Sequence, residues 1–199
     1  MRGVSGFGTT SNTTWKNWAG NQHCSPHDIE RPLSEAQLQT IVQQAAAAGR
    51  RVRAVGSGHS FTSIACSDDV LVSLEHLNMV RSIGRRSRLV TVQAGIELRH
   101  LNNRLAKVGL AMTNLGDIAY QSFAGAVSTG THGTGLAFTG IAAQIRGMRV
   151  VTATGEIVDC SAEQNPELFH VARVGLGAFG IISEITIEVE PAFNLHAIE

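Results

Sequence analysis

The sequence predicts an α+β fold, and three observations support this prediction. The first quarter of the chain has the pattern of a β-α-β unit, and the rest contains mostly alternating strand patterns with inserted helices. The chain has 21 glycines and only 4 prolines, which indicates tight turns and close backbone contacts rather than disorder. Its 199 residues suffice for one domain, or for two small subdomains that share a core.

The β-α-β unit contains a helix whose start is marked by a capping box. Ser34 is the expected N-cap and Gln37 completes the box, since both side chains can accept hydrogen bonds from backbone N–H groups at the helix start. Apolar residues then recur at helical spacing until Gly49, which is expected to end the helix. Residues 51–55 alternate in polarity and residues 70–74 are mostly apolar, so both segments predict strands.

The remainder of the chain predicts four further strands and two helices. Residues 88–94, 145–152, 155–160 and 181–189 have strand patterns, and the last of them places Glu184 and Glu188 on one face, followed by Glu190. Residues 97–108 carry leucines on one helical face, with Gly109 after them. A second helix is expected to start at the cap Asn165, continue through a proline in its first turn and end near residue 175.

Composition excludes several classes of protein. The 16 basic residues balance the 16 acidic ones, so no electrostatic footprint for nucleic acid or an anionic membrane is expected. Residues 1–14 form a flexible arm without the apolar core of a signal peptide, and no apolar run approaches the roughly 20 residues that span a bilayer. A cytoplasmic location is therefore expected. Cys24, Cys66 and Cys160 are scattered, which favours reduced structural thiols over a disulfide framework or a metal site.

Residues 56–60, Gly-Ser-Gly-His-Ser, follow a predicted strand directly. Two glycines allow such a turn to present consecutive backbone N–H groups to an anion, and Ser57 and Ser60 add hydroxyl donors. The loop is not a P-loop, because no Gly-Lys-Ser/Thr follows. Taken alone, this pentapeptide leaves a plain strand-to-loop turn as the stronger interpretation and phosphate binding as the alternative.

Residues 115–135 are rich in glycine, alanine and hydroxyl side chains. A backbone with few bulky side chains can approach a flat ligand closely, with His132 beside it. The competing interpretation is a core helix of small residues followed by a turn, with His132 as a structural histidine. The residues alone favour neither of the two.

Residues 175–180 fit the spacing G-x-G-x-x-G, but the surrounding order is reversed. A dinucleotide fingerprint needs a strand before the glycines and a helix after them, whereas here a predicted helix precedes and a strand follows. A nicotinamide-binding function is therefore rejected, although the loop backbone is able to contact another cofactor.

Four segments, taken in order, resemble the PCMH-type FAD-binding domain of the vanillyl-alcohol-oxidase-type flavoproteins. Within this group the resemblance is greatest to the L-gulonolactone, D-arabinono-1,4-lactone and alditol oxidases. It covers about residues 15–191 and rests on residues 17–20 (Asn-Trp-Ala-Gly), 53–61 (Arg-Ala-Val-Gly-Ser-Gly-His-Ser-Phe), 114–118 (Asn-Leu-Gly-Asp-Ile) and 124–133 (Ala-Gly-Ala-Val-Ser-Thr-Gly-Thr-His-Gly).

The resemblance implies two α/β subdomains, about 15–75 and 76–191, with FAD between them. It implies that His59 is bonded covalently to the flavin, because a neutral imidazole nitrogen can add to the electrophilic 8α carbon of the ring. A non-covalent contact of His59 with FAD is the alternative. The implied cofactor-binding residues are Ala54, Val55, Gly56, Ser57, Gly58, His59 and Ser60 around the diphosphate, with Asp117, Ser122, Gly125, Thr129, Gly130, Thr131, His132 and, through its backbone, Ile182.

The resemblance further implies oxidation of a CH–OH group of a sugar lactone or polyol, with hydride passing to flavin N5 and electrons to dioxygen, giving hydrogen peroxide. Gly116 and Asp117 are placed on the substrate side of the flavin. The absence of a side chain at Gly116 would leave room for dioxygen, which favours an oxidase over a dehydrogenase.

Family members continue into a substrate domain that supplies the residues for binding and deprotonating the sugar. This chain stops at Glu199, so residues 192–199 are interpreted as the start of a missing substrate domain and the chain as a fragment. Its exposed face is then prone to self-association. A catalytically silent FAD-binding fragment is the alternative to an active oxidase.

Overall fold

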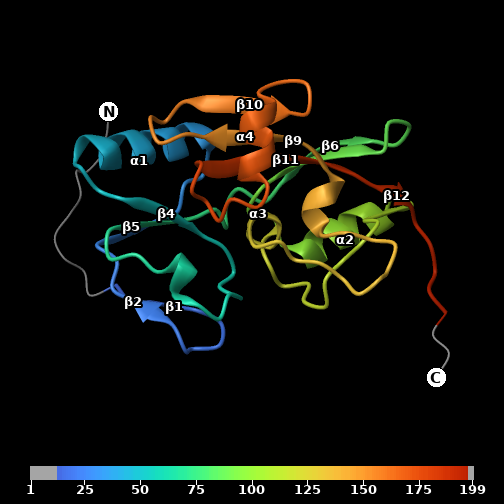
Figure 1. Cartoon of the computed structure of the whole chain (residues 1–199), viewed down its shortest axis with the longest axis horizontal. Helices are drawn as coiled ribbons and strands as arrows, with labels where there is room; N and C mark the ends of the chain where they lie inside the picture. The colour runs from blue at the N-terminus through green and yellow to red at the C-terminus, as the bar shows by residue number, and fades with distance from the viewer. Residues whose placement is uncertain (1–12, 197–199) are drawn as a thin grey trace.

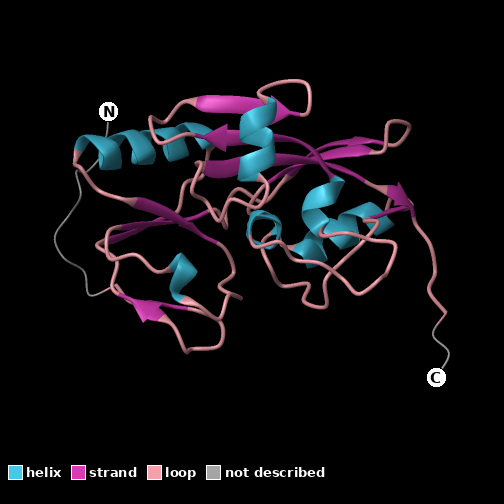
Figure 2. Ribbon diagram, viewed as in Figure 1, coloured by secondary structure: helices cyan, strands magenta, loops and turns pink. Residues whose placement is uncertain are grey.

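The computed structural model describes residues 13–196 and confirms the α+β prediction (Figures 1 and 2). In this part of the chain, four α-helices accompany two main sheets and two short two-stranded ones. The strands are β1 (Trp15–Lys16), β2 (His23–Cys24), β3 (Asp28–Glu30), β4 (Val52–Val55), β5 (Val70–Ser73), β6 (Val80–Gly84), β7 (Leu89–Gln93), β8 (Leu110–Ala111), β9 (Ile145–Val151), β10 (Ile157–Ser161), β11 (Ile181–Glu188) and β12 (Glu190–Pro191). The helices are α1 (Glu35–Ala47), α2 (Leu98–Ala106), α3 (Phe123–Ser128) and α4 (Pro166–Ala172).

The first main sheet is parallel, with the order β3-β5-β4. Helix α1 connects β3 to β4, which confirms the predicted β-α-β unit. The central strand is an unbroken apolar run, Val70, Leu71 and Val72, and each residue is fully buried. Such a run is typical of a parallel strand that is covered on both faces.

The second main sheet is antiparallel, with the order β10-β9-β11-β7-β6. Strand β11 lies at its centre, and Ile185 pairs with Met148 on one side and Val92 on the other. The predicted alternation is confirmed, since Ile185 and Ile187 are fully buried while Glu184 and Glu188 are partly exposed. A register shift between Ile182 and Glu184 lets Ser183 face inward as well.

The predicted helix starts at α1 and α4 are both confirmed. Ser34 Oγ accepts from Gln37 N–H at 3.2 Å, and Gln37 Oε1 accepts from Leu33 N–H at 2.7 Å, so the capping box is present with its return bond one residue early. Asn165 is the N-cap of α4, with the proline in the first turn. Its backbone is left-handed, and its side-chain amide donates to the Asp159 carbonyl rather than capping the helix.

One continuous apolar core joins the two main sheets, and a polar bridge lies at their junction. Ser183 Oγ donates to Glu35 Oε1 at 2.5 Å, and Arg149 Nη1 lies 3.3 Å from Glu35 Oε2. Glu35 opens α1, whereas Ser183 and Arg149 belong to β11 and β9. The bridge therefore fixes the helix of the parallel unit on the antiparallel sheet.

The described residues, 13–196, include only part of the predicted terminal segments. Most of the predicted arm, residues 1–14, and residues 197–199 of the predicted start of a substrate domain lie outside the described residues. The division into subdomains near residues 75 and 76 stays a prediction, and it falls between β5 and β6. Among residues 13–196, no helix combines the length and apolar character needed to cross a membrane.

We predict that Ser183→Ala destabilises the fold by about 1.5–3 kcal/mol, the range for a buried hydrogen bond to a charged group. The hydroxyl is 2% exposed, and its loss removes a donor from the Glu35 carboxylate at the junction. Urea unfolding measures the change, with Ser87→Ala as the control, because the Ser87 hydroxyl bonds only within an exposed turn. Equal losses for the two variants would show that the bridge is not a stabilising feature.

Candidate FAD-binding site

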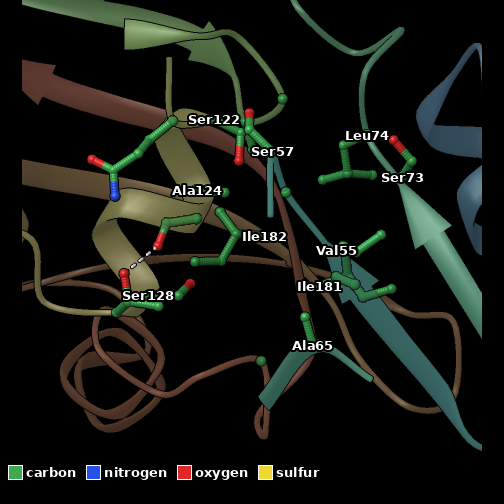
Figure 3. Close-up of a pocket in the computed structure, with 18 of the residues that line it drawn as sticks. Val55, Ser57, Ala65, Ser73, Leu74, Ser122, Ala124, Ser128, Ile181 and Ile182 are labelled. Atoms are coloured by element: carbon green, nitrogen blue, oxygen red, sulfur yellow. Dashed lines mark hydrogen bonds between the residues drawn. The ribbon is translucent and has the colours of Figure 1, made fainter. Parts of the chain in front are cut away.

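A cavity of about 610 Å³ lies where the carboxyl ends of β4 and β5 face α3 and the loop after α4. Figure 3 shows Ser122, Ala124 and Ser128 on one side of it, with Val55 and Ser73 on the other. Ligands of open α/β sheets bind beyond the carboxyl ends of parallel strands, and small-molecule sites typically measure about 300–1,000 Å³. Position and volume therefore both fit a cofactor site.

The glycine loop, residues 56–60, begins as β4 ends and forms one wall of this cavity. Gly58 has φ +73°, and a Cβ there would lie 3.3 Å from both Asn17 Cα and Trp18 N. A left-handed backbone in such close contact requires glycine. The Gly58 carbonyl accepts a hydrogen bond of 2.8 Å from Trp18 N–H, so the hairpin loop between β1 and β2 holds the glycine loop.

The other glycine of the loop lets the two halves of the cavity touch. A Cβ on Gly56 would lie 2.3 Å from Ser122 Oγ, and one on Gly125 would lie 2.8 Å from the same atom. Ser122 precedes α3 and Gly125 lies inside it. The backbone of the loop therefore approaches α3 as closely as backbone atoms allow, with only the Ser122 side chain between them.

A small apolar cluster lies beside the glycine loop and contains Cys24, Val55 and Leu71, with Cys66 packed against it. Burial raises the pKa of the Cys66 thiol, and contact with Cys24 raises it further. A higher pKa favours the protonated form of the Cys66 thiol, which lowers its reactivity. All three cysteines are free thiols in the structure.

Most of the predicted cofactor residues come together around the cavity. These are Ala54, Val55, Gly56, Ser57, Gly58, His59, Ser60, Ser122, Gly125, Thr129 and Ile182. They come from segments separated by more than a hundred positions in the sequence. Their role as cofactor contacts stays a prediction, which this convergence supports.

The remaining predicted residues, Gly116, Asp117, Gly130, Thr131 and His132, do not line the cavity and gather beside it. A Cβ on Gly116 would lie 2.8 Å from Thr131 Cγ2, so the two segments touch. Thr131 Oγ1 also accepts from the Gln121 amide at 3.1 Å, and Gln121 lines the cavity. The segment of Gly116 thus lies against Thr131, which hydrogen-bonds to a residue of the cavity.

The cavity offers polar groups but little positive charge. Hydroxyls of Ser57, Ser60 and Thr129 lie along it, with the carboxylates of Glu75 and Glu97. Among residues 13–196, no lysine or arginine lines it. An anionic group would therefore depend on backbone N–H groups and hydroxyls for binding, as in the anion nests formed by turns.

Sequence reasoning missed several residues of this site. Glu97 and His100 line the cavity, and the leucine pattern of α2 marks their face as polar without showing what it meets. Asn17 and Trp18 belong to a motif whose role the sequence leaves open. The G-x-G-x-x-G loop follows α4 and precedes β11, which agrees with rejecting a nicotinamide fingerprint, and most of its residues line the cavity.

Known proteins of similar sequence are lactone oxidoreductases. The chain is 47% identical over 182 residues to the L-gulono-1,4-lactone dehydrogenase of Mycobacterium tuberculosis, covering 92% of this chain and 42% of that protein. It is 42% identical over 180 residues to a putative D-arabinono-1,4-lactone oxidase of Neurospora crassa, covering 90% and 32%. The L-gulonolactone oxidase of Scyliorhinus torazame is 36% identical over 182 residues, covering 92% and 41%. The chain spans about two fifths or less of the length of these relatives.

Residues 26–161 match a family model described as an FAD binding domain. This range runs from the segment before β3 to the end of β10 and contains the glycine loop, α3 and the Gly116 segment. The match and the relatives confirm the resemblance found in the motifs. The chain therefore belongs to the PCMH-type FAD-binding domain family.

Proposed function

We propose that the chain is the FAD-binding part of an oxidoreductase that oxidises the CH–OH group of a sugar lactone, of the L-gulono-1,4-lactone or D-arabinono-1,4-lactone type. The observation that carries this proposal is the glycine loop, which forms a wall of the cavity at the carboxyl ends of β4 and β5. The names of the relatives support the substrate class. Bound FAD would supply the hydride acceptor, and the protein would hold and orient it.

The residues on the cavity fit FAD in three ways. Gly56 and Gly58 let the loop pack closely against Ser122 and against the loop of Asn17 and Trp18. A turn with two glycines is able to present consecutive backbone N–H groups to a diphosphate. The hydroxyls of Ser57 and Ser60 add donors. Ile182 and Ala124 contribute apolar surface on the far side, which suits a flat aromatic ring (Figure 3).

We propose that His59 carries a covalent bond to the flavin. His59 lines the cavity and is half-buried, so its imidazole is accessible from the cofactor side. Bond formation joins an imidazole nitrogen to the 8α carbon and breaks one N–H and one C–H bond. The two protons and two electrons pass to dioxygen, which gives hydrogen peroxide.

A second candidate function is an FAD-binding module that does not oxidise lactones by itself. The chain spans about two fifths or less of the length of the relatives that are named for lactone oxidation, and the part matched by the family model is an FAD binding domain. In this second candidate, FAD binding and the bond to His59 remain, while the chain alone does not oxidise a lactone.

The first experiment tests FAD binding, on which both candidates depend. The purified chain is expected to be yellow, to keep its colour through acid precipitation, and to show one added FAD in intact mass spectrometry. His59→Ala is expected to lose the added mass while still binding FAD reversibly. A chain that takes up no FAD would refute both candidate functions.

Anaerobic addition of L-gulono-1,4-lactone or D-arabinono-1,4-lactone then tests activity. Bleaching of the flavin absorbance supports the oxidoreductase, and stable colour supports the module. The acid-stable yellow colour of bound FAD must be present before either lactone is added, so that loss of FAD is not mistaken for inactivity.

We predict that Gly56→Ala weakens FAD retention and lowers the free energy of unfolding by about 1–3 kcal/mol, the usual range for overpacking. The added methyl would lie 2.3 Å from Ser122 Oγ. In the double variant Gly56→Ala/Ser122→Ala the next contact is Ser122 Cβ at 3.5 Å, an ordinary distance. The double variant should therefore recover most of the loss in a double-mutant cycle. If the stability losses of the two single variants simply add in the double variant, the contact with Ser122 Oγ is not the cause of the loss.

We propose that dioxygen accepts the electrons, and that Gly116 leaves it room. Gly116→Ala is expected to slow reoxidation of the reduced flavin by dioxygen, measured by stopped flow. The new methyl would also meet Thr131 Cγ2 at 2.8 Å, so the same change is made with Thr131→Ser, which removes that methyl group. Slow reoxidation in the double variant supports a role in oxygen access. Reoxidation at the rate of the Thr131→Ser single variant refutes it.

A further inference from the structure

The hairpin loop between β1 and β2 is hydrogen-bonded to the glycine loop through the buried side-chain amide of Asn17. Asn17 is 3% exposed, and its side chain uses every hydrogen-bonding group it has. Its Oδ1 accepts from Gln22 N–H at 3.0 Å, and its Nδ2 donates to Asn21 Oδ1 at 2.7 Å and to the Ser60 carbonyl at 2.9 Å. A buried amide with all its partners in place fixes the two segments that it joins.

The same hairpin loop touches the other side of His59. Trp18 N–H donates to the Gly58 carbonyl at 2.8 Å. The indole ring of Trp18 lies 5.5 Å from the imidazole ring of His59, at an angle of 31°. The carbonyls before and after His59 are thus both held, and its side chain rests against an aromatic ring.

Burial does not explain this tryptophan. Trp18 is 68% exposed, so its ring contributes little to the core and has its contact with His59 instead. Ring contacts of this kind limit the rotamers that an imidazole can adopt.

We propose that Asn17 and Trp18 are positioning residues that hold the His59 imidazole for its bond with the flavin. This inference rests on the covalent link under the proposed function. Bond formation needs the reacting atoms about 3–3.5 Å apart and aligned, and a misplacement of about 1 Å can cost about a hundredfold in rate. Asn17 fixes the backbone of the loop, and Trp18 fixes the orientation of the ring.

The test follows covalent incorporation of FAD into the apo chain over time, by intact mass spectrometry. Trp18→Ala is expected to slow incorporation about ten- to hundredfold. Trp18→Phe, which keeps an aromatic ring, is expected to incorporate FAD at nearly the rate of the chain without substitutions. Phe193→Ala is the matched control, because Phe193 is an exposed aromatic residue that does not line the cavity. Incorporation into Trp18→Ala at the unchanged rate would overturn the role of Trp18.

Asn17→Asp tests the backbone grip, because it keeps the acceptor for Gln22 N–H and replaces the donor to the Ser60 carbonyl with an oxygen. It is expected to slow incorporation and to speed hydrogen exchange of the amides in residues 57–61. If this charged variant does not fold, Asn17→Ala is measured in the same way. Unchanged incorporation and exchange would overturn the role of Asn17.

If Trp18 had a purely structural role, its loss would weaken non-covalent FAD binding. This binding is therefore measured in variants that carry His59→Ala, in which no covalent bond can form. His59→Ala and Trp18→Ala/His59→Ala are expected to bind FAD with dissociation constants within about twofold of each other, since ordinary surface substitutions have small effects. A large difference would show that Trp18 supports the cavity rather than His59.

The two proposals fail differently. If the unchanged chain binds FAD without a covalent adduct, the link at His59 is wrong and the positioning role is refuted with it. If the unchanged chain forms the adduct and the Asn17 and Trp18 variants form it equally fast, only the positioning role is refuted.

Discussion

The close approach of the glycine loop to α3 is the constraint on which the site depends. Gly56 and Gly125 lie on either side of one serine hydroxyl, and a Cβ would lie 2.3 Å from that oxygen at Gly56 and 2.8 Å from it at Gly125. The cavity exists because β4 and β5 open toward α3 at this spacing. The small residues of the loop and of α3 are thus explained by one geometric need: two backbones that lie close together and leave N–H groups free for a ligand.

The polar bridge between Glu35 and Ser183 holds the same two sheets at another place. It joins the start of α1 to the centre of the antiparallel sheet, so the parallel unit is attached both by its helix and by its glycine loop. Two attachments far apart in the sequence restrict rotation between the units far more than one would. Packing within the protein therefore fixes the shape of the cavity between them before a ligand binds. A preformed cavity lowers the conformational entropy that is lost on binding.

Periodicity predicted most of the fold, because the core-facing residues of α1, α2 and β11 follow the periods of their elements. It missed β1, β2, β8 and β12, since strands of two residues are too short to show alternation, and it also missed β3 and the five-residue β6. The N-cap position of Asn165 was predicted, but not the bond of its amide to the Asp159 carbonyl. The resemblance grouped the glycine loop with Ser122, and both line one cavity. No local pattern could show that Glu97 and His100 face it, because that depends on how α2 packs.

The charge of the site follows from its construction. A cavity built from backbone and hydroxyl groups can bind a diphosphate without lysine or arginine, and among residues 13–196 none lines it. Its carboxylates pair with arginines that do not line the cavity, Glu75 with Arg31 and Glu97 with Arg99. Binding of this kind relies on fixed dipoles and weakens little with salt, in contrast to sites made of exposed ion pairs. The proposed anion site therefore needs no excess of basic residues, which agrees with the zero net charge of the chain.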